Sequence, residues 1–215
     1  MIEPSEERTN SFALPAGDLA SRTQVVGDFV RSQASGLAII DLRESGTEHL
    51  SPGDGITDVK GWERALHLIE RSLATTVALF GQRVGGCALE VGLACDFRIA
   101  APGSEVIWHN NGAVWPGTAL FRLVHLVGPA QTIRLALLGE PVHAHAALVS
   151  GLVDVITDDP EAEVEKLRAA VAGLDDLRVV RQLVAEATHT SYDEALGAHL
   201  AACERYLRRR GVEVD

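Results

Sequence analysis

The chain has 215 residues, of which 47% are hydrophobic and 5% aromatic, a length and composition that suit one globular domain with an ordinary core. Its formal net charge of −11 argues against a nucleic-acid partner, because no stretch gathers enough Lys or Arg to neutralise several phosphates. It has no N-terminal basic segment before an apolar run and no stretch of ~18 uncharged apolar residues. We therefore expect a soluble, cytoplasmic protein with no membrane partner.

Strand-length apolar runs and segments of helical spacing alternate along the first half of the chain, after residues 1–10, which we expect to fray. In chain order, the expected elements are an edge strand at 11–14, a helix from Asp18, a strand at 36–42, a helix around 62–69, a strand at 75–80, a helix over 89–95, and strands at 97–101 and 106–109. This alternation predicts an α/β layered sheet.

From Thr118 onward the pattern is mostly helical, with one short strand expected at 152–156. Two long helical stretches are expected to start near Pro160 and Ser191. We find no internal repeat, and no linker is long or polar enough to divide the chain. The sequence therefore predicts a single domain over residues 1–215.

Three cysteines, Cys87, Cys95 and Cys203, lie in apolar or helical surroundings. They are odd in number and lack the paired spacing of zinc sites. We interpret them as small buried hydrophobes, and we expect no metal site and no cofactor.

The stretch "GQRVGGCALEVGLACDFRIA", residues 81–100, joins a glycine loop to a helix with one acid, Glu90. A strand that ends at Phe80, followed by Gly85, Gly86 and a helix, places backbone N–H groups at a helix N-terminus, where negative charge is attracted. Taken alone, a glycine-rich turn from strand to helix is weak evidence, because it is also typical of a tight turn without a ligand.

The wider segment from Gly81 to Ile156 resembles the enoyl-CoA hydratase/isomerase (crotonase) superfamily. The match is strongest at "LACDFRIA", "HLVGPAQTIRLALLGEPV" and "ALVSGLVDVI", which keep the family's residue types at its spacing. The resemblance implies a crotonase-like spiral of ββα units with a helical C-terminal region. It implies that residues 160–215 mediate assembly into a homotrimer or hexamer. It also implies an acyl-CoA substrate, with coenzyme A present only as part of that substrate.

The same resemblance implies an oxyanion hole, in which two backbone N–H groups bind the thioester carbonyl and stabilise an enolate. One donor falls at Gly86, where the absence of a side chain lets a ligand approach closely. The other falls at the N–H of Asp54, because "LSPGDG", residues 50–55, looks like the family's earlier loop. The expected residues of the substrate pocket are Cys87, Asn110 and Asn111.

The hydratases of this family use two glutamates as general acid and base, and the chain departs from the pattern at both places. Counting forward from the double glycine places the first at Leu89, whereas counting back from Asp96 places it at Glu90. One position on a helix is ~100° of rotation, which decides whether a carboxylate faces the pocket. The second glutamate is missing, and His109 stands nearby. The expected catalytic residues are Glu90 and His109.

Two functions remain open from the sequence. In the first, the chain is an active acyl-CoA lyase or hydratase. In the second, it is a catalytically reduced subunit that binds an acyl-CoA or a partner enzyme. Its length and the missing second glutamate resemble the small crotonase-like proteins of dihydroxyphenylglycine biosynthesis in antibiotic producers. Those proteins accompany a type III polyketide synthase that makes 3,5-dihydroxyphenylacetyl-CoA, so this resemblance implies such a synthase as partner.

A third function, a peptidase of the related Clp type, would need a nucleophile near the start of the helix that carries Glu90. Cys87 lies near that place, but no "GxSxA"-type loop supports the assignment. A cysteine directly after Gly86 is more simply interpreted as a packing residue.

Overall fold

The computed structural model describes residues 11–33, 36–108, 115–174 and 176–211, and it forms two compact units, Met1–Ala172 and Gly173–Asp215. A five-stranded sheet lies at the centre of the first unit, and all of its neighbouring strands are parallel. Its strands, in spatial order, are β1 (Ser11–Ala13), β2 (Leu37–Leu42), β3 (Thr75–Phe80), β5 (Phe97–Ala100) and β8 (Val155–Ile156). The α/β prediction is confirmed, and the short N-terminal strand lies at a sheet edge as expected.

A second, smaller sheet has three short strands in the order β4 (Arg83–Val84), β6 (Glu105–Val106) and β7 (Val142–His143). The strand β4 runs parallel to β6, and β6 runs antiparallel to β7. The strand expected at 106–109 is therefore shorter than predicted and begins one residue earlier.

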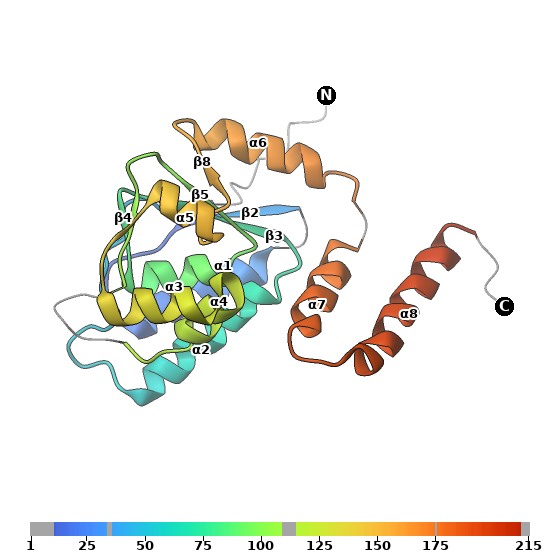
Figure 1. Cartoon of the computed structure of the whole chain (residues 1–215), viewed down its shortest axis with the longest axis horizontal. Coiled ribbons are helices and arrows are strands. Elements are labelled where there is room, and N and C mark those ends of the chain that lie inside the picture. The colour runs from blue at the N-terminus through green and yellow to red at the C-terminus, as the bar shows by residue number, and fades with distance from the viewer. Residues whose placement is uncertain (1–10, 34–35, 109–114, 175, 212–215) are drawn as a thin grey trace, which may run out of the picture. The chain divides into compact units, whose positions relative to one another are not determined.

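The helices of the first unit cover both faces of the large sheet, as Figure 1 shows. Alternate side chains of β2 and β3 point to opposite faces, so Ile40 and Phe80 contribute to the larger core and Leu37 and Val77 to the smaller one. The larger core includes side chains from α1 to α4, whereas Val164 of α6 packs into the smaller core. The helices are α1 (Leu19–Ser32), α2 (Ile56–Glu70), α3 (Gly86–Ala94), α4 (Ala119–Leu138), α5 (Ala144–Ser150) and α6 (Pro160–Val171).

The short helix α3 is buried along its whole length, which explains why its sequence is apolar on every face except at Glu90. It contacts α2, α4 and β3. The turn from α3 into β5 is fixed by Asp96, whose Oδ2 accepts from Thr76 N at 2.7 Å and from Thr76 Oγ1 at 2.9 Å. The "CD" of the matched motif therefore ends the helix and aligns β5 beside β3.

The helix α4 joins two segments that the sequence separates at "GP". Its backbone is non-helical at Gly128, with φ of 79°, and Pro129 follows directly. Proline lacks the N–H that would continue the helical ladder, so the kink falls where the sequence changes. The helix ends at Gly139 in the left-handed conformation, a common terminator.

The second unit contains the helices α7 (Leu177–Ala187) and α8 (Tyr192–Arg209). The predicted helix starts near Pro160 and Ser191 are confirmed, and Ser191 forms a capping box with Glu194. The helical region expected at 160–215 contains α7, although no separate helix start was predicted near Leu177. The helical region expected at 160–215 is divided, since α6 belongs to the first unit. Within the described ranges, no helix combines the length and apolarity needed to cross a bilayer.

Candidate active site

The carboxylate of Glu90 is held inside the first unit by two indole groups. Its side chain is 2% exposed. Trp62 of α2 donates its Nε1–H to Glu90 Oε2 at 2.6 Å, and Trp115, ahead of α4, donates to Oε1 at 2.9 Å. Leu89 instead packs in the hydrophobic core. The structure thus shows how the side chain at each of the two counted positions is held, and the catalytic role of Glu90 stays a prediction.

Burying a carboxylate is unfavourable unless hydrogen bonds replace its lost hydration. The two indole N–H groups supply such hydrogen bonds. A hydrogen bond to an ionised acceptor is stronger than one to a neutral acceptor. Each carboxylate oxygen accepts one indole bond and retains further acceptor capacity. The two indole bonds thus orient the Glu90 carboxylate in a fixed direction.

His49 lies beside this carboxylate, although the sequence analysis did not single it out. Its Nδ1 is 3.7 Å from Glu90 Oε1, and its ring stacks on Trp115 with centroids 5.7 Å apart. Both ring nitrogens are buried, and within the described part of the chain neither has a hydrogen-bond partner. The sequence held one signal for this residue: His49 stands directly before the "LSPGDG" loop, which had already been assigned to the site.

The segment that carries His49 is held against the N-terminus of α3. The N–H of Cys87 donates to Glu48 O at 3.0 Å, and Cys87 Sγ donates to His49 O at 2.9 Å. A Cβ on Gly86 would overlap the backbone carbonyls of Thr47 and Glu48. Gly86 is therefore required for the close approach of the segment that carries His49.

Cys87, an expected pocket residue, lies in the hydrophobic core and is 1% exposed. Burial, followed by the negative charge of Glu90, raises the pKa of the Cys87 thiol to about 12. The thiol is therefore protonated at neutral pH, and a peptidase-type nucleophile at this position finds no support. Cys87 contributes to the site as a donor that fixes the backbone of His49.

The two expected oxyanion donors differ in their surroundings. Gly86 is the first residue of α3, with φ of 51°, so its N–H lies at a helix N-terminus. The N–H of Asp54 instead donates to Ser51 O at 3.1 Å, which closes a turn. The Asp54 carboxylate accepts from Ser51 N at 2.6 Å and from Leu19 N at 3.1 Å. This N–H is thus engaged in its own turn, contrary to the expectation of a donor open to substrate.

Three expected site residues, His109, Asn110 and Asn111, lie outside the described residues, and their roles stay predictions. The described chain resumes at Trp115, which contacts Glu90. A Cβ on Gly117 would overlap the Trp115 indole, so the chain turns tightly against that ring.

A cluster of charged side chains fixes the segment that carries Trp115 to α2. Thr118 Oγ1 donates to Glu63 Oε2. Arg122 Nη1 lies 3.2 Å from Glu63 Oε2, and Arg122 Nε lies 2.6 Å from Glu70 Oε1. The arginine side chain is 10% exposed, whereas Glu63 and Glu70 are 21% and 33% exposed, so the cluster is only partly shielded from water. These contacts position the Trp115 indole, and through it the carboxylate of Glu90.

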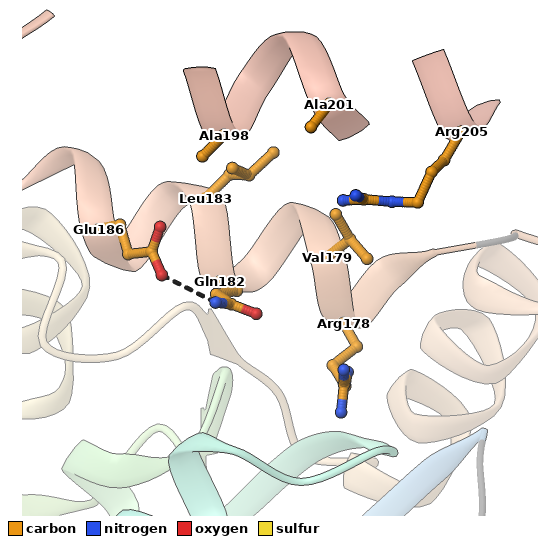
Figure 2. Close-up of a pocket in the computed structure, with 8 residues that line it drawn as sticks. All are labelled: Arg178, Val179, Gln182, Leu183, Glu186, Ala198, Ala201 and Arg205. Carbon is orange, nitrogen blue, oxygen red and sulfur yellow. Dashed lines mark hydrogen bonds between the residues drawn. The ribbon is translucent and has the colours of Figure 1, made fainter. Parts of the chain in front are cut away.

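A separate hollow of about 370 Å³ lies between α7 and α8 in the second unit, and Figure 2 shows its lining. Gln182 donates to Glu186 across 2.8 Å on one side, and Arg178 and Arg205 also line the hollow. These groups are spread over exposed helix faces, and none resembles the buried arrangement around Glu90.

Comparisons with known proteins found no matching family model. The chain is 40% identical over 157 residues to an enoyl-CoA hydratase of Amycolatopsis orientalis, covering 72% of each chain. It is 32% identical over 158 residues to an ethylmalonyl-CoA decarboxylase of Xenopus tropicalis, covering 68% of this chain and 52% of the relative. It thus spans about three quarters of the first relative and about half of the second.

Solved structures show the same fold at lower identity. An enoyl-CoA hydratase from Bacillus anthracis superposes with a TM-score of 0.75 at 18% identity, covering 89% of this chain and 81% of the other. A Thermobifida fusca protein in complex with acetoacetyl-CoA gives a TM-score of 0.77 at 16% identity, covering 87% and 85%. The crotonase-like fold expected from the sequence is confirmed. On the identity and coverage of the Amycolatopsis relative, the chain belongs to the enoyl-CoA hydratase (crotonase) superfamily.

Proposed function

We propose that this protein acts on an acyl-CoA thioester and that Glu90 transfers a proton during the reaction, as in hydration or dehydration of an enoyl-CoA. The observation that carries this proposal is the burial of the Glu90 carboxylate with both oxygens oriented by indole N–H groups. A carboxylate on a solvated helix face would need no such support. The name of the Amycolatopsis relative supports the reaction class, and the bound acetoacetyl-CoA of a fold neighbour supports the substrate class.

The oxyanion hole in this proposal uses the N–H of Gly86 as one donor, because it opens a buried helix near Glu90. The second donor comes from the 50–55 loop. Within that loop Pro52 has no N–H, and three others are engaged: Ser51 with Asp54, Asp54 with Ser51, and Gly55 with Asp58. The N–H groups of Leu50 and Gly53 remain as candidates. Each well-aimed donor is worth about 10²–10³-fold in rate.

The test is the reaction of crotonyl-CoA with the wild-type protein and with Glu90→Gln, which keeps the shape and removes the titrating group. We expect the rate of the variant to fall by about 10²–10⁴-fold, the usual contribution of general acid–base catalysis, with acyl-CoA binding preserved. Glu140→Gln, at an exposed position, is the matched control and should not change the rate. Equal rates for wild type and Glu90→Gln across acyl-CoA substrates would refute the proposal.

The narrower substrate we propose is an intermediate in the formation of 3,5-dihydroxyphenylacetyl-CoA, delivered by a type III polyketide synthase. The length of the chain and the missing second glutamate support it through the resemblance described above. Incubation with the synthase and malonyl-CoA, followed by chromatography of the acyl-CoA products, tests it. If Glu90→Gln stimulates the synthase as well as the wild type does, the protein is a helper subunit and not the enzyme proposed.

We also propose assembly into a homotrimer or hexamer through the C-terminal helices. No described residue of α7 or α8 is buried within the chain, and both carry exposed apolar side chains, among them Val180, Val184 and Leu200. Such side chains are typical of a protein interface. Light scattering at micromolar concentration tests this proposal, and a monomer would contradict it.

A further inference from the structure

We infer that His49 is a second proton-transfer group of this site, in contact with the acyl-CoA and sharing one proton with Glu90 through the reaction cycle. This inference rests on the acyl-CoA chemistry proposed above. It supplies a residue for the position at which the sequence lacks a second glutamate.

The imidazole of His49 is a polar group in a largely buried position. Its side chain is 12% exposed, and both nitrogens are buried without a hydrogen-bond partner in the described part of the chain. Buried polar atoms are nearly always paired, because leaving one unpaired sacrifices its hydration without compensation. An apolar side chain would fill the same space at lower cost. The unpaired nitrogens therefore point to a partner that arrives with the substrate.

The ring of His49 lies beside Glu90 and the Trp115 indole. The nearest charged group is Glu90, whose Oε1 lies 3.7 Å from Nδ1. The Cys87 thiol donates to the backbone carbonyl of His49 and not to its ring. One face of the ring stacks on Trp115, which itself donates to Glu90. Arg22 and Asp54 act on the neighbouring Cys87 thiol, so they also contribute to the local field.

The separation of the two groups suits a pair that acts on one substrate. At 3.7 Å, Nδ1 and Oε1 are too far apart for a hydrogen bond, but they attract each other as an ion pair when the imidazole is protonated. They are close enough for a proton to pass between them after a small rotation of the imidazole. Trp115 contacts both groups, because its Nε1–H donates to the carboxylate and its ring stacks on the imidazole.

The step balances as follows for hydration of an enoyl-CoA. Glu90 takes a proton from water as the water oxygen bonds to Cβ, and the electrons of the double bond move to the thioester as an enolate. The imidazolium of His49 gives its proton to Cα, and the enolate electrons form the new C–H bond. The proton on Glu90 then passes to His49, which restores a carboxylate and an imidazolium. The net change is the addition of one water.

The test compares His49→Gln with His143→Gln, a control in which the substituted ring is 76% exposed. We expect His49→Gln to lose about 10²-fold or more in kcat, the usual value of a proton-transfer group, while acyl-CoA affinity is retained. In His49→Ala, added imidazole should restore part of the rate, with a pH dependence that follows the added base. A residue with a structural role alone would show neither the kcat-specific loss nor the rescue.

The outcomes separate this inference from the proposed function. If Glu90→Gln is inactive and His49→Gln keeps a kcat within about threefold of wild type, His49 is not a proton-transfer group and the proposed function stands. If wild type and Glu90→Gln behave alike, the proposed function itself fails.

A measurement on the wild-type protein guards against a variant that does not fold. In protein labelled at its histidine rings, the His49 resonance can be identified by its contacts with the Trp115 ring. We expect its ring nitrogen shifts to change when crotonyl-CoA is added and not when coenzyme A alone is added. An unchanged His49 resonance in saturating crotonyl-CoA would overturn the inference.

Discussion

Trp62 and Glu90 are joined by an indole N–H···O bond of 2.6 Å between two side chains that are each 2% exposed. Trp62→Phe removes this donor and leaves Glu90 Oε2 buried without it. We expect the free energy of unfolding to fall by about 1.5–3 kcal/mol, the usual worth of a hydrogen bond to a charged group, in addition to the loss from the smaller ring. Urea denaturation measures this change.

A double-mutant cycle separates the hydrogen bond from the packing of Trp62. In the Glu90→Gln background the acceptor is neutral, so Trp62→Phe should cost less than it costs in the wild type. Equal costs in the two backgrounds would show that the bond between these side chains contributes nothing to stability.

Gly86 lies against the backbone of Glu48, so a substitution there acts on the fold as well as on any ligand. Gly86→Ala would place a Cβ on the carbonyls of Thr47 and Glu48 and would strain a residue with φ of 51°. The matched control is Gly151→Ala, because Gly151 is left-handed with φ of 80° and its Cβ would meet only Leu126 O, at 3.9 Å. The control should lose about 1–2 kcal/mol through backbone strain alone, and Gly86→Ala should lose clearly more. Equal losses of stability would contradict the close approach.

The three cysteines should differ sharply in their reaction with iodoacetamide. Cys87 and Cys95 are buried, as expected from the sequence, whereas the interpretation of Cys203 as buried was wrong, because it lies exposed. Since the pKa of Cys87 is raised to about 12, almost none of it is thiolate at pH 8. We expect Cys203 to be modified first, as mass spectrometry of proteolytic fragments would reveal. Rapid modification of Cys87 in the native protein would show that its environment is wrongly described.

The same thiol should make stability depend on pH in the alkaline range. The Cys87 pKa rises from 9.0 to about 12 on folding, so above pH 9 the unfolded chain loses this proton while the folded protein keeps it. Its contribution is fully present below pH 9 and is lost as the pH rises towards 12. Over that range the unfolding equilibrium constant should rise by up to about tenfold per pH unit because of this group. Cys87→Ala should lack this slope, and parallel curves for the two proteins would contradict the assignment.

The sheet and most of its helices could be predicted from the sequence because their signals are local. The runs at 37–42 and 75–80 are apolar and β-branched over the length of a strand, and Asp18 and Ser191 are ordinary helix N-caps. The division of the expected helical region between α6 and α7 was missed, because it falls in a short segment that begins at Gly173 and contains no proline to mark it.

The candidate site could be predicted only in part. The chain pattern placed an acid in α3 but left two positions possible, because helical phase cannot be counted across a loop of altered length. Contacts of Glu90 with Trp62 and Trp115 show how this acid is held, and they join segments 28 and 25 residues away in sequence. His49 was missed because the contacts that place it beside Glu90 and Trp115 come from distant parts of the chain and not from a motif. Asp54 was assigned by motif, but its own turn uses the N–H in question.

Arg122 provides the last test, because it links α2 to the segment that orients Trp115. Its guanidinium bonds to Glu63 and Glu70 of α2, and Glu63 also accepts from Thr118. Arg122→Met keeps much of the aliphatic length and removes the charge. We expect this change to lower the free energy of unfolding by about 1–3 kcal/mol, because two partly exposed carboxylates lose their common cation.

The effect of Arg122→Met on the reaction should follow from the position of Trp115. If the clamp orients the indole on Glu90, kcat for the acyl-CoA reaction should fall by about tenfold while the substrate affinity changes little, since a misplaced acid slows the chemical step. Arg43→Met is the control, because Arg43 also bridges two carboxylates, Asp41 and Glu161, in a different part of the unit. A loss of stability with unchanged kcat would show that Arg122 supports the fold and leaves the orientation of Glu90 to the two indoles alone.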